Sequence, residues 1–176
     1  MGASGWSYFT PFRPNVAHAL EELRQHVFLT KQYGDPALKP FHQHPGEMDG
    51  LTPEQRNQME DLIATQARAI DAYKDIRGPE VEPISIDQLL ELSAESGTHS
   101  IIDIYFVSDT RELGAAFPMP DDVKLDLYGT TRPTQEQVEA KSHARGEDLD
   151  RWQCWYVIVY KDDQPDEIYF EGCSGD

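Results

Sequence analysis

The sequence has few features that would identify a reaction or a compartment. Cysteine is scarce, and the two cysteines present, Cys154 and Cys173, lie in or beside apolar segments. We interpret them as buried free thiols, which are typical of a reducing compartment; a disulfide between neighbouring strands is the alternative. At 176 residues the chain is long enough to bury a hydrophobic core without disulfide or metal cross-links.

Long hydrophobic runs are also missing. No apolar stretch approaches the ~20 residues that cross a bilayer. Residues 1–6 have neither the basic region nor the apolar core of a secretory signal. We therefore expect a cytoplasmic protein without a membrane partner.

Basic side chains are scarce as well. The chain has 15 lysines and arginines against 32 aspartates and glutamates, for a net charge of −17. Residues 1–78 carry 10 acidic and 8 basic side chains, whereas residues 79–176 carry 22 and 7. A field of this sign repels nucleic acid and anionic lipid, and it attracts cationic molecules. We therefore expect no nucleic-acid partner and a basic protein partner.

Hydrophobic periodicity predicts that helices dominate the first part of the chain and strands the last part. The predicted helices follow capping residues or repeat apolar residues at helical spacing: 15–30, 52–76, a short one capped by Ser85, 121–128 and 134–144. The predicted strands are rich in aromatic and β-branched residues: 4–12, 99–107, 152–161 and 167–173. We expect 99–107 to be a central strand because both of its faces are largely apolar, 109–120 to be turn-like, and 162–166 to be a turn.

These elements predict an α+β fold, in which helices pack on one face of a small, mainly antiparallel sheet that ends in a C-terminal β-hairpin. We expect residues 1–176 to form a single domain. Within it, residues 33–50 are predicted to form a long loop and residues 79–84 an internal linker.

Four potential metal ligands lie close together in the predicted loop: His42, His44, Glu47 and Asp49. Imidazole and carboxylate groups suit zinc and other divalent metals. However, the two histidines of an extended His-x-His segment point in opposite directions, and the Pro-Gly pair that follows prevents a helix from regrouping them. We therefore favour a polar surface loop and no cofactor, with a divalent-metal site at His42, His44 and Glu47 as the alternative.

A second group of residues has the types needed for nucleophilic catalysis: His99, Ser100 and Asp103. On an extended strand His99 and Ser100 would point to opposite faces, so we expect them to satisfy backbone groups. Asp103 interrupts an apolar face, and a buried carboxylate needs a partner or a shifted pKa. The alternative is a small hydrolase-type enzyme in which His99 and Asp103 meet Cys173 and Ser174 of the C-terminal Cys-Ser-Gly-Asp segment.

The acidic pieces of the second half are each typical of a solvated surface, and none matches the calcium-binding loop pattern. Together, however, they exceed what solubility requires. The sequence therefore favours an acidic protein-binding module, comparable to an immunity or inhibitor protein, that engages a basic protein. The candidate binding residues are two aromatic anchors and four acids of the hairpin turn: Tyr105, Tyr128, Asp162, Asp163, Asp166 and Glu167.

The sequence opens with Gly2-Ala3-Ser4-Gly5-Trp6, continues through Gly97-Thr98-His99-Ser100-Ile101 and finishes with Gly172-Cys173-Ser174-Gly175-Asp176. In these segments it resembles an uncharacterised family of small bacterial proteins. The resemblance spans the whole chain and implies a bacterial origin, but no activity. The matching positions of most interest are Trp6, His99, Ser174 and Asp176.

Overall fold

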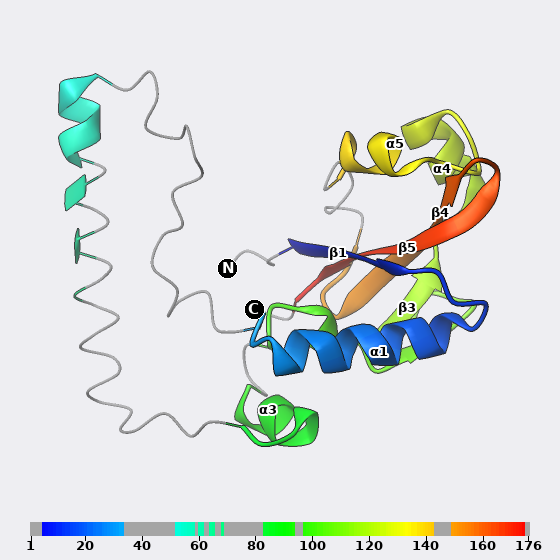
Figure 1. The fold of residues 1–176 in the computed structure, drawn as a ribbon. Coiled ribbons are helices and arrows are strands. Elements are labelled where there is room, and N and C mark those ends of the chain that lie inside the picture. Colours follow the sequence, from blue (N-terminus) through cyan, green and yellow to red (C-terminus); the bar gives the residue numbers. More distant parts are fainter. Residues whose placement is uncertain are drawn as a thin grey trace. The chain divides into compact units, whose positions relative to one another are not determined.

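The computed structural model describes residues 5–33, 52–58, 60, 61, 64, 65, 68, 83–93, 97–142 and 149–174. The chain divides into two compact units, one formed by residues 34–83 and the other by residues 1–33 together with 84–176. The larger unit contains the following elements, of which all but η2 and β2 are labelled in Figure 1: β1 Gly5–Pro11, α1 Val16–Leu29, α3 Ile86–Leu92, the 3-10 turn η2 Ile101–Asp103, β2 Phe106–Val107, β3 Ala115–Pro118, α4 Asp121–Tyr128, α5 Gln135–Glu139, β4 Gln153–Lys161 and β5 Gln164–Cys173.

In the unit of residues 34–83, the described residues 53–58, 60, 61, 64, 65 and 68 are helical. The predicted capping box is present, because Thr52 Oγ1 accepts from the Gln55 N–H and the Gln55 side chain accepts from the Thr52 N–H. The proposed ligands His42, His44 and Glu47 lie outside the described residues, as do most of the predicted loop and linker. Within the described ranges no helix is long and apolar enough to cross a membrane.

The larger unit is built on a five-stranded sheet with the order β1-β5-β4-β3-β2. β5 pairs antiparallel with both β1 and β4, while β3 pairs parallel with β4 and β2. The α+β class, with a mostly antiparallel sheet and a C-terminal hairpin of β4 and β5, is therefore confirmed. The hairpin turn is tighter than predicted, since Asp162 and Asp163 alone form it, with φ values of 50° and 61°, and β5 already begins at Gln164. Two left-handed residues are what a two-residue hairpin turn of type I′ requires.

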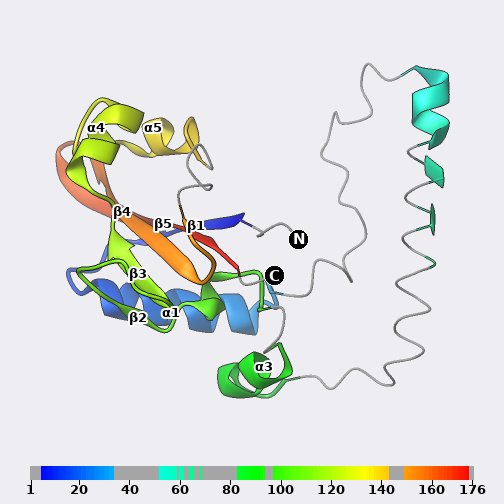
Figure 2. The same ribbon diagram turned by 180° about the vertical axis from the view of Figure 1, so that it is seen from behind.

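The two faces of the sheet carry separate hydrophobic clusters because successive strand residues point to opposite sides. On one face Trp6, Cys154 and Phe170 pack with Leu20 and Leu23 of α1. The other face holds a cluster that includes residues of α4 and α5: Phe117, Met119, Tyr128, Val138, Leu149, Trp155, Val157, Val159, Tyr169 and Cys173. Figures 1 and 2 show α1 on one side of the sheet and the shorter α4 and α5 towards the other.

The predicted strand over 99–107 is wrong for most of its length. Residues 101–103 form a 3-10 turn, and only Phe106–Val107 is a strand, at the edge of the sheet rather than its centre. The physical reason is local side-chain hydrogen bonding: Ser100 Oγ accepts from the Ile102 N–H at 3.3 Å, and Asp103 Oδ1 accepts from the Thr98 N–H at 2.7 Å. Side chains that satisfy the backbone in this way compete with a sheet ladder.

β3, which the sequence predicted as part of a turn, lies inside the sheet between β4 and the edge strand β2. Ala115 and Ala116 are fully buried, and Phe117 is 5% exposed. The short strand follows Gly114, and its Ala116 and Phe117 belong to the hydrophobic clusters on opposite faces of the sheet. A four-residue segment of this kind has too little alternation to be recognised as a strand from its sequence.

Candidate functional site

A buried chain of polar contacts joins the start, the middle and the end of the larger unit. The Trp6 Nε1–H donates to Ser174 Oγ at 3.0 Å, and the Ser174 hydroxyl donates to Asp103 Oδ2 at 3.0 Å. Asp103 Oδ1 in turn accepts from the Thr98 N–H. We call Trp6, Thr98, Asp103 and Ser174 the clasp; its Ser174 and Asp103 are 0% exposed. The clasp joins the segment 97–104 to the edge strand β1 and to the end of β5 beside it.

The Asp103 carboxylate is the charged member of the clasp, and its surroundings oppose ionisation. Burial raises its pKa above the ordinary value of 3.8, while hydrogen bonds from Thr98 and Ser174 and the positive charge of His99 act against that rise. The negative charge of Asp103 also affects the pKa of two nearby tyrosines. Burial and the Asp103 charge together raise the pKa of Tyr8 to about 12, and the pKa of Tyr105 is raised by the same two causes.

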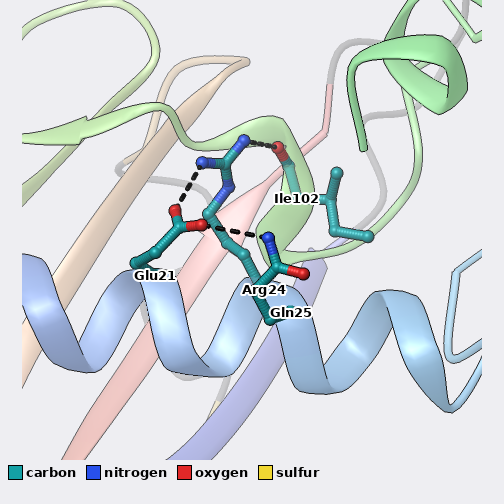
Figure 3. A network of polar contacts seen from close by, with 4 residues as sticks. All are labelled: Glu21, Arg24, Gln25 and Ile102. Carbon is teal, nitrogen blue, oxygen red and sulfur yellow. Dashed lines mark hydrogen bonds and ion pairs between the residues drawn. The ribbon is translucent and has the colours of Figure 1, made fainter. Parts of the chain in front are cut away.

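The segment that carries Asp103 is also fixed from the side of α1. Arg24 Nη2 donates to the Ile102 carbonyl at 3.4 Å, and Arg24 Nη1 contacts Glu21 Oε2 at 3.2 Å. Gln25 Nε2 donates to the other carboxylate oxygen of Glu21 at 3.1 Å. Figure 3 shows this network, in which the guanidinium bridges from the helix to the turn. The clasp and Arg24 thus hold the η2 turn from two directions.

A pocket of about 310 Å³ opens beside the clasp. Its walls combine apolar or aromatic side chains with small or polar residues: Leu90, Tyr105, Leu113 and Trp152, and Ser93, Gly97, Asp103 and Gly114. Ligand pockets typically have volumes of roughly 300–1,000 Å³. The volume here therefore suits a small molecule or a single side chain.

Three of the lining residues have backbones in the left-handed region: Gly97 at φ 76°, Gly114 at φ 75° and Trp152 at φ 63°. A bulky residue with positive φ is uncommon, and such strain persists where the surrounding structure enforces it. Here hydrogen bonds do so, because the Gly114 N–H donates to the Trp152 carbonyl at 2.6 Å and the Trp152 N–H donates to the Cys173 carbonyl at 2.9 Å. Backbone hydrogen bonds therefore hold Gly114 and Trp152 in place at the pocket.

The two glycines also permit close approaches that shape the pocket. A Cβ at Gly97 would lie 2.9 Å from Asp103 Oδ2 and 2.9 Å from Trp152 Cη2. The buried carboxylate and the indole ring therefore both lie close to the Gly97 backbone. A Cβ at Gly114 would lie 2.7 Å from Tyr105 Cδ2. Glycine at both positions keeps the aromatic rings close to the backbone without filling the pocket.

The residues proposed for an enzyme site are brought together only in part. Asp103 and Ser174 are in contact, and His99, with φ 51°, is close enough for its charge to act on Asp103. Cys173 belongs to the cluster on the other face of the sheet. Ser174 is completely buried and accepts a hydrogen bond from Trp6, so its oxygen is not presented to the pocket.

The candidate binding residues separate into three environments. Tyr105 is 52% exposed and lines the pocket, whereas Tyr128 is 8% exposed and packs in the hydrophobic core. The four acids of the hairpin lie at its tip and at the start of β5: Asp162, Asp163, Asp166 and Glu167. They form part of a separate acidic surface.

That acidic surface includes a residue that the sequence reasoning did not single out, Glu139 of α5. Burial raises the pKa of Glu167, the neighbouring charges of Asp166 and Glu139 raise it further, and Lys161 lowers it. Glu167 Oε2 is buried, and no hydrogen-bond donor within the described part of the chain reaches it. We call Glu139, Asp162, Asp163, Asp166 and Glu167 the acidic end.

The structure adds pocket residues that sequence reasoning missed, namely Gly97, Gly114 and Trp152. An isolated glycine just before a short apolar segment is a signal for close backbone approach, and Gly114 fits that pattern. Nothing in the sequence marks Trp152 as different from the other aromatic residues of its segment. The described residues contain no cluster of three histidine, cysteine or acidic side chains that could hold a metal ion.

Comparison of the chain with protein-family models, with curated proteins and with solved structures finds no match. The resemblance to a family of small bacterial proteins therefore stays a prediction.

Proposed function

We propose that this protein is a binding module that engages a basic protein partner through its acidic end, in the manner of an immunity or inhibitor protein. The observation that carries the proposal is the environment of the Glu167 carboxylate. Its carboxylate lies near the charges of Asp166 and Glu139, and one of its oxygens is buried without a hydrogen-bond donor among the described residues. Such a group is costly in the free protein, and a guanidinium or ammonium group supplied by a partner would relieve it.

The charge of the whole chain supports the same proposal. A net charge of −17 would steer a cationic protein towards this surface and raise the association rate. The same field disfavours nucleic acid as a partner. The two cysteines are free and buried, which supports action in a reducing, cytoplasmic compartment.

Hydrolase activity at the clasp has less support. A nucleophilic serine must reach a substrate, but Ser174 is 0% exposed and both accepts from Trp6 and donates to Asp103. These contacts favour a structural role for Ser174, in which the clasp fixes the C-terminal strand to the pocket floor.

The proposal can be tested by affinity capture from a lysate of the source cells at low and high salt. The bait would be the wild-type protein, E139Q/E167Q, or the control D87N/E91Q, which removes the same two charges from exposed positions of α3. We expect a basic protein that the wild type and the control capture at low salt and that E139Q/E167Q loses.

The captured protein would then be purified and its association rate measured against ionic strength. A rate that falls as salt rises, and that falls further in E139Q/E167Q than in D87N/E91Q, supports the proposal. Equal capture by the two double variants would contradict it, because charge at the acidic end would then be irrelevant.

A further inference from the structure

We propose that the pocket beside the clasp is a second binding site, and that it takes an alkylammonium group. This inference does not depend on the acidic end, because the pocket is lined by other residues. It rests on the pocket's size, on the kinds of side chain in its walls and on the buried carboxylate at its floor.

The walls present aromatic and aliphatic groups at a place that stays open to solvent. Tyr105 and Leu113 line the pocket and are 52% and 71% exposed, respectively, and Trp152 lines it too. Tyrosine and tryptophan rings attract cations through their π faces while also contacting methyl groups. An organic cation with apolar substituents satisfies both properties, whereas a hydrated metal ion does not.

The floor supplies charge of the opposite sign. Asp103 is 0% exposed, and its described hydrogen bonds come from neutral donors: the Thr98 N–H, the Thr98 side chain and the Ser174 hydroxyl. A carboxylate has about four acceptor positions, so the group retains capacity for a further interaction. Because Asp103 is shielded from water, its field is screened less than that of a surface carboxylate and reaches into the pocket.

The backbone conformation of the pocket residues supports the proposal. Trp152 has a positive φ of 63°, and strained backbone of this kind gathers at ligand sites. At Gly97 any side chain would intrude between Asp103 Oδ2 and the Trp152 indole, so glycine keeps the carboxylate next to the pocket space. The same carboxylate disfavours bound anions, and a bound cation would add to the positive charge of His99 in offsetting its charge.

The test is a titration of the full chain, followed by nuclear magnetic resonance, with choline and with 3,3-dimethylbutan-1-ol, its neutral isostere. The Trp152 indole N–H signal, assigned with W152F, reports on the pocket. We expect choline to shift this signal and to bind at least about ten-fold more tightly than the alcohol. Equal affinities for the two compounds, or shifts that map away from the pocket, would overturn the proposal.

Variants separate the contributions of the floor and the walls. D103N keeps an acceptor for the Thr98 N–H and removes the charge, so it should abolish the preference for choline over the alcohol. Y105L should weaken choline binding by about three-fold or more through loss of the ring. The control L125A alters a half-exposed leucine of α4 and should bind choline as the wild type does.

Further measurements cover a failure of D103N to fold, the acidic end and the source of the ammonium group. If D103N fails to fold, Y105L and the neutral isostere still decide the outcome, because Tyr105 is a half-exposed residue whose loss is tolerated better. E139Q/E167Q should retain choline binding, which keeps a failure of the acidic end distinguishable from a failure of the pocket. N-acetyl-lysine methylamide tests the source of the ammonium group: tighter binding than choline assigns the pocket to a partner's lysine, and weaker binding assigns it to a free small cation.

Discussion

Ser174 Oγ donates a hydrogen bond to Asp103 Oδ2 at 3.0 Å across 71 positions of the chain, in a site from which water is excluded. The contact joins the end of the central hairpin to the turn that forms the pocket floor. Since Trp6 donates to the same serine oxygen, a single hydroxyl links three segments. Four predictions follow from the clasp, the pocket and the core around them.

Replacement of Ser174 by alanine should destabilise the fold. S174A removes the acceptor of the Trp6 indole N–H and a donor to Asp103, leaving both groups buried with an unmet hydrogen bond. We expect the free energy of unfolding to fall by about 2–3 kcal/mol, measured by urea denaturation. The control T131A, at an exposed position, should change it by less than about 0.5 kcal/mol. Equal effects of the two variants would show that the clasp does not stabilise the protein.

Substitution of Gly114 would affect stability in two ways, through the Tyr105 ring close to it and through its left-handed backbone. Comparison with Gly129 separates the two effects. Gly114 and Gly129 have nearly the same φ, 75° and 73°, so alanine should cost each position about 1 kcal/mol in backbone strain. A Cβ at Gly114 would also meet the Tyr105 ring, whereas a Cβ at Gly129 would meet nothing within 4 Å.

We therefore expect G114A to lower the free energy of unfolding by about 1–3 kcal/mol more than G129A. In a Y105A background this difference should largely disappear, which thermal or urea denaturation would show. If the difference between the two alanine variants persisted without the Tyr105 ring, the close approach of ring and backbone would not be its cause.

The buried Asp103 carboxyl should give the protein a characteristic dependence of stability on pH. Burial raises its pKa in the folded state above 3.8, so the folded protein binds this proton more tightly than the unfolded chain does. The resulting stabilisation is fully present below the unfolded pKa and is lost as pH rises through the folded pKa.

Urea denaturation of the wild type and D103N between about pH 3.5 and 7 would measure this effect. The free energy of unfolding of the wild type, relative to D103N, should decrease as pH rises. The charge of His99 acts on Asp103, so the comparison of the wild type with D103N would be repeated in an H99Q background. A difference that increased with pH would mean that Asp103 is stabilised in its charged form.

The cysteines should be unreactive in the folded protein and should not pair with each other. Cys154 lies opposite Gly172 in the register of β4 and β5, so Cys173, the next residue, points to the other face of the sheet. Burial raises the pKa of the Cys154 thiol well above its ordinary value, which suppresses the reactive thiolate.

Alkylation with iodoacetamide, followed by mass spectrometry, should therefore be slow in the native protein and rapid in denaturant. Treatment with a mild oxidant should leave a chain without an internal disulfide. Rapid native alkylation at Cys154, or a bond between Cys154 and Cys173, would contradict the arrangement of the two strands.

Several elements could be predicted because their signals are local. The apolar spacing after Pro14 predicted α1, and in the structure Asn15 caps this helix, because its Oδ1 accepts from the Ala17 N–H. Ser85 and Thr134 likewise cap the helices predicted after them. The β4–β5 hairpin was predicted from two runs of aromatic and β-branched residues around an acidic turn. In each case the residues that determine the element lie within a few positions of it.

The segment around Asp103 shows where local signals fail. Its apolar residues are buried as predicted, with Ile101, Ile102 and Ile104 fully inaccessible, but burial there is achieved by a turn rather than a strand. Alternation cannot distinguish the two, because a turn that packs on α1 and a sheet face also buries consecutive residues. The choice was made by the hydrogen bonds of Ser100 and Asp103, whose partners depend on the backbone path.

The sequence by itself determined the charge, the helix caps, the hairpin and the α+β class, because each depends on composition or on neighbours in the chain. Only the tertiary structure decided that Trp6, Asp103 and Ser174 meet, and that Tyr105 and Trp152 line one pocket. These contacts join segments up to 168 positions apart, and a pairing at that distance is set by strand order and register. Burial of the shared apolar faces selects that register, and it involves the whole larger unit rather than any one segment.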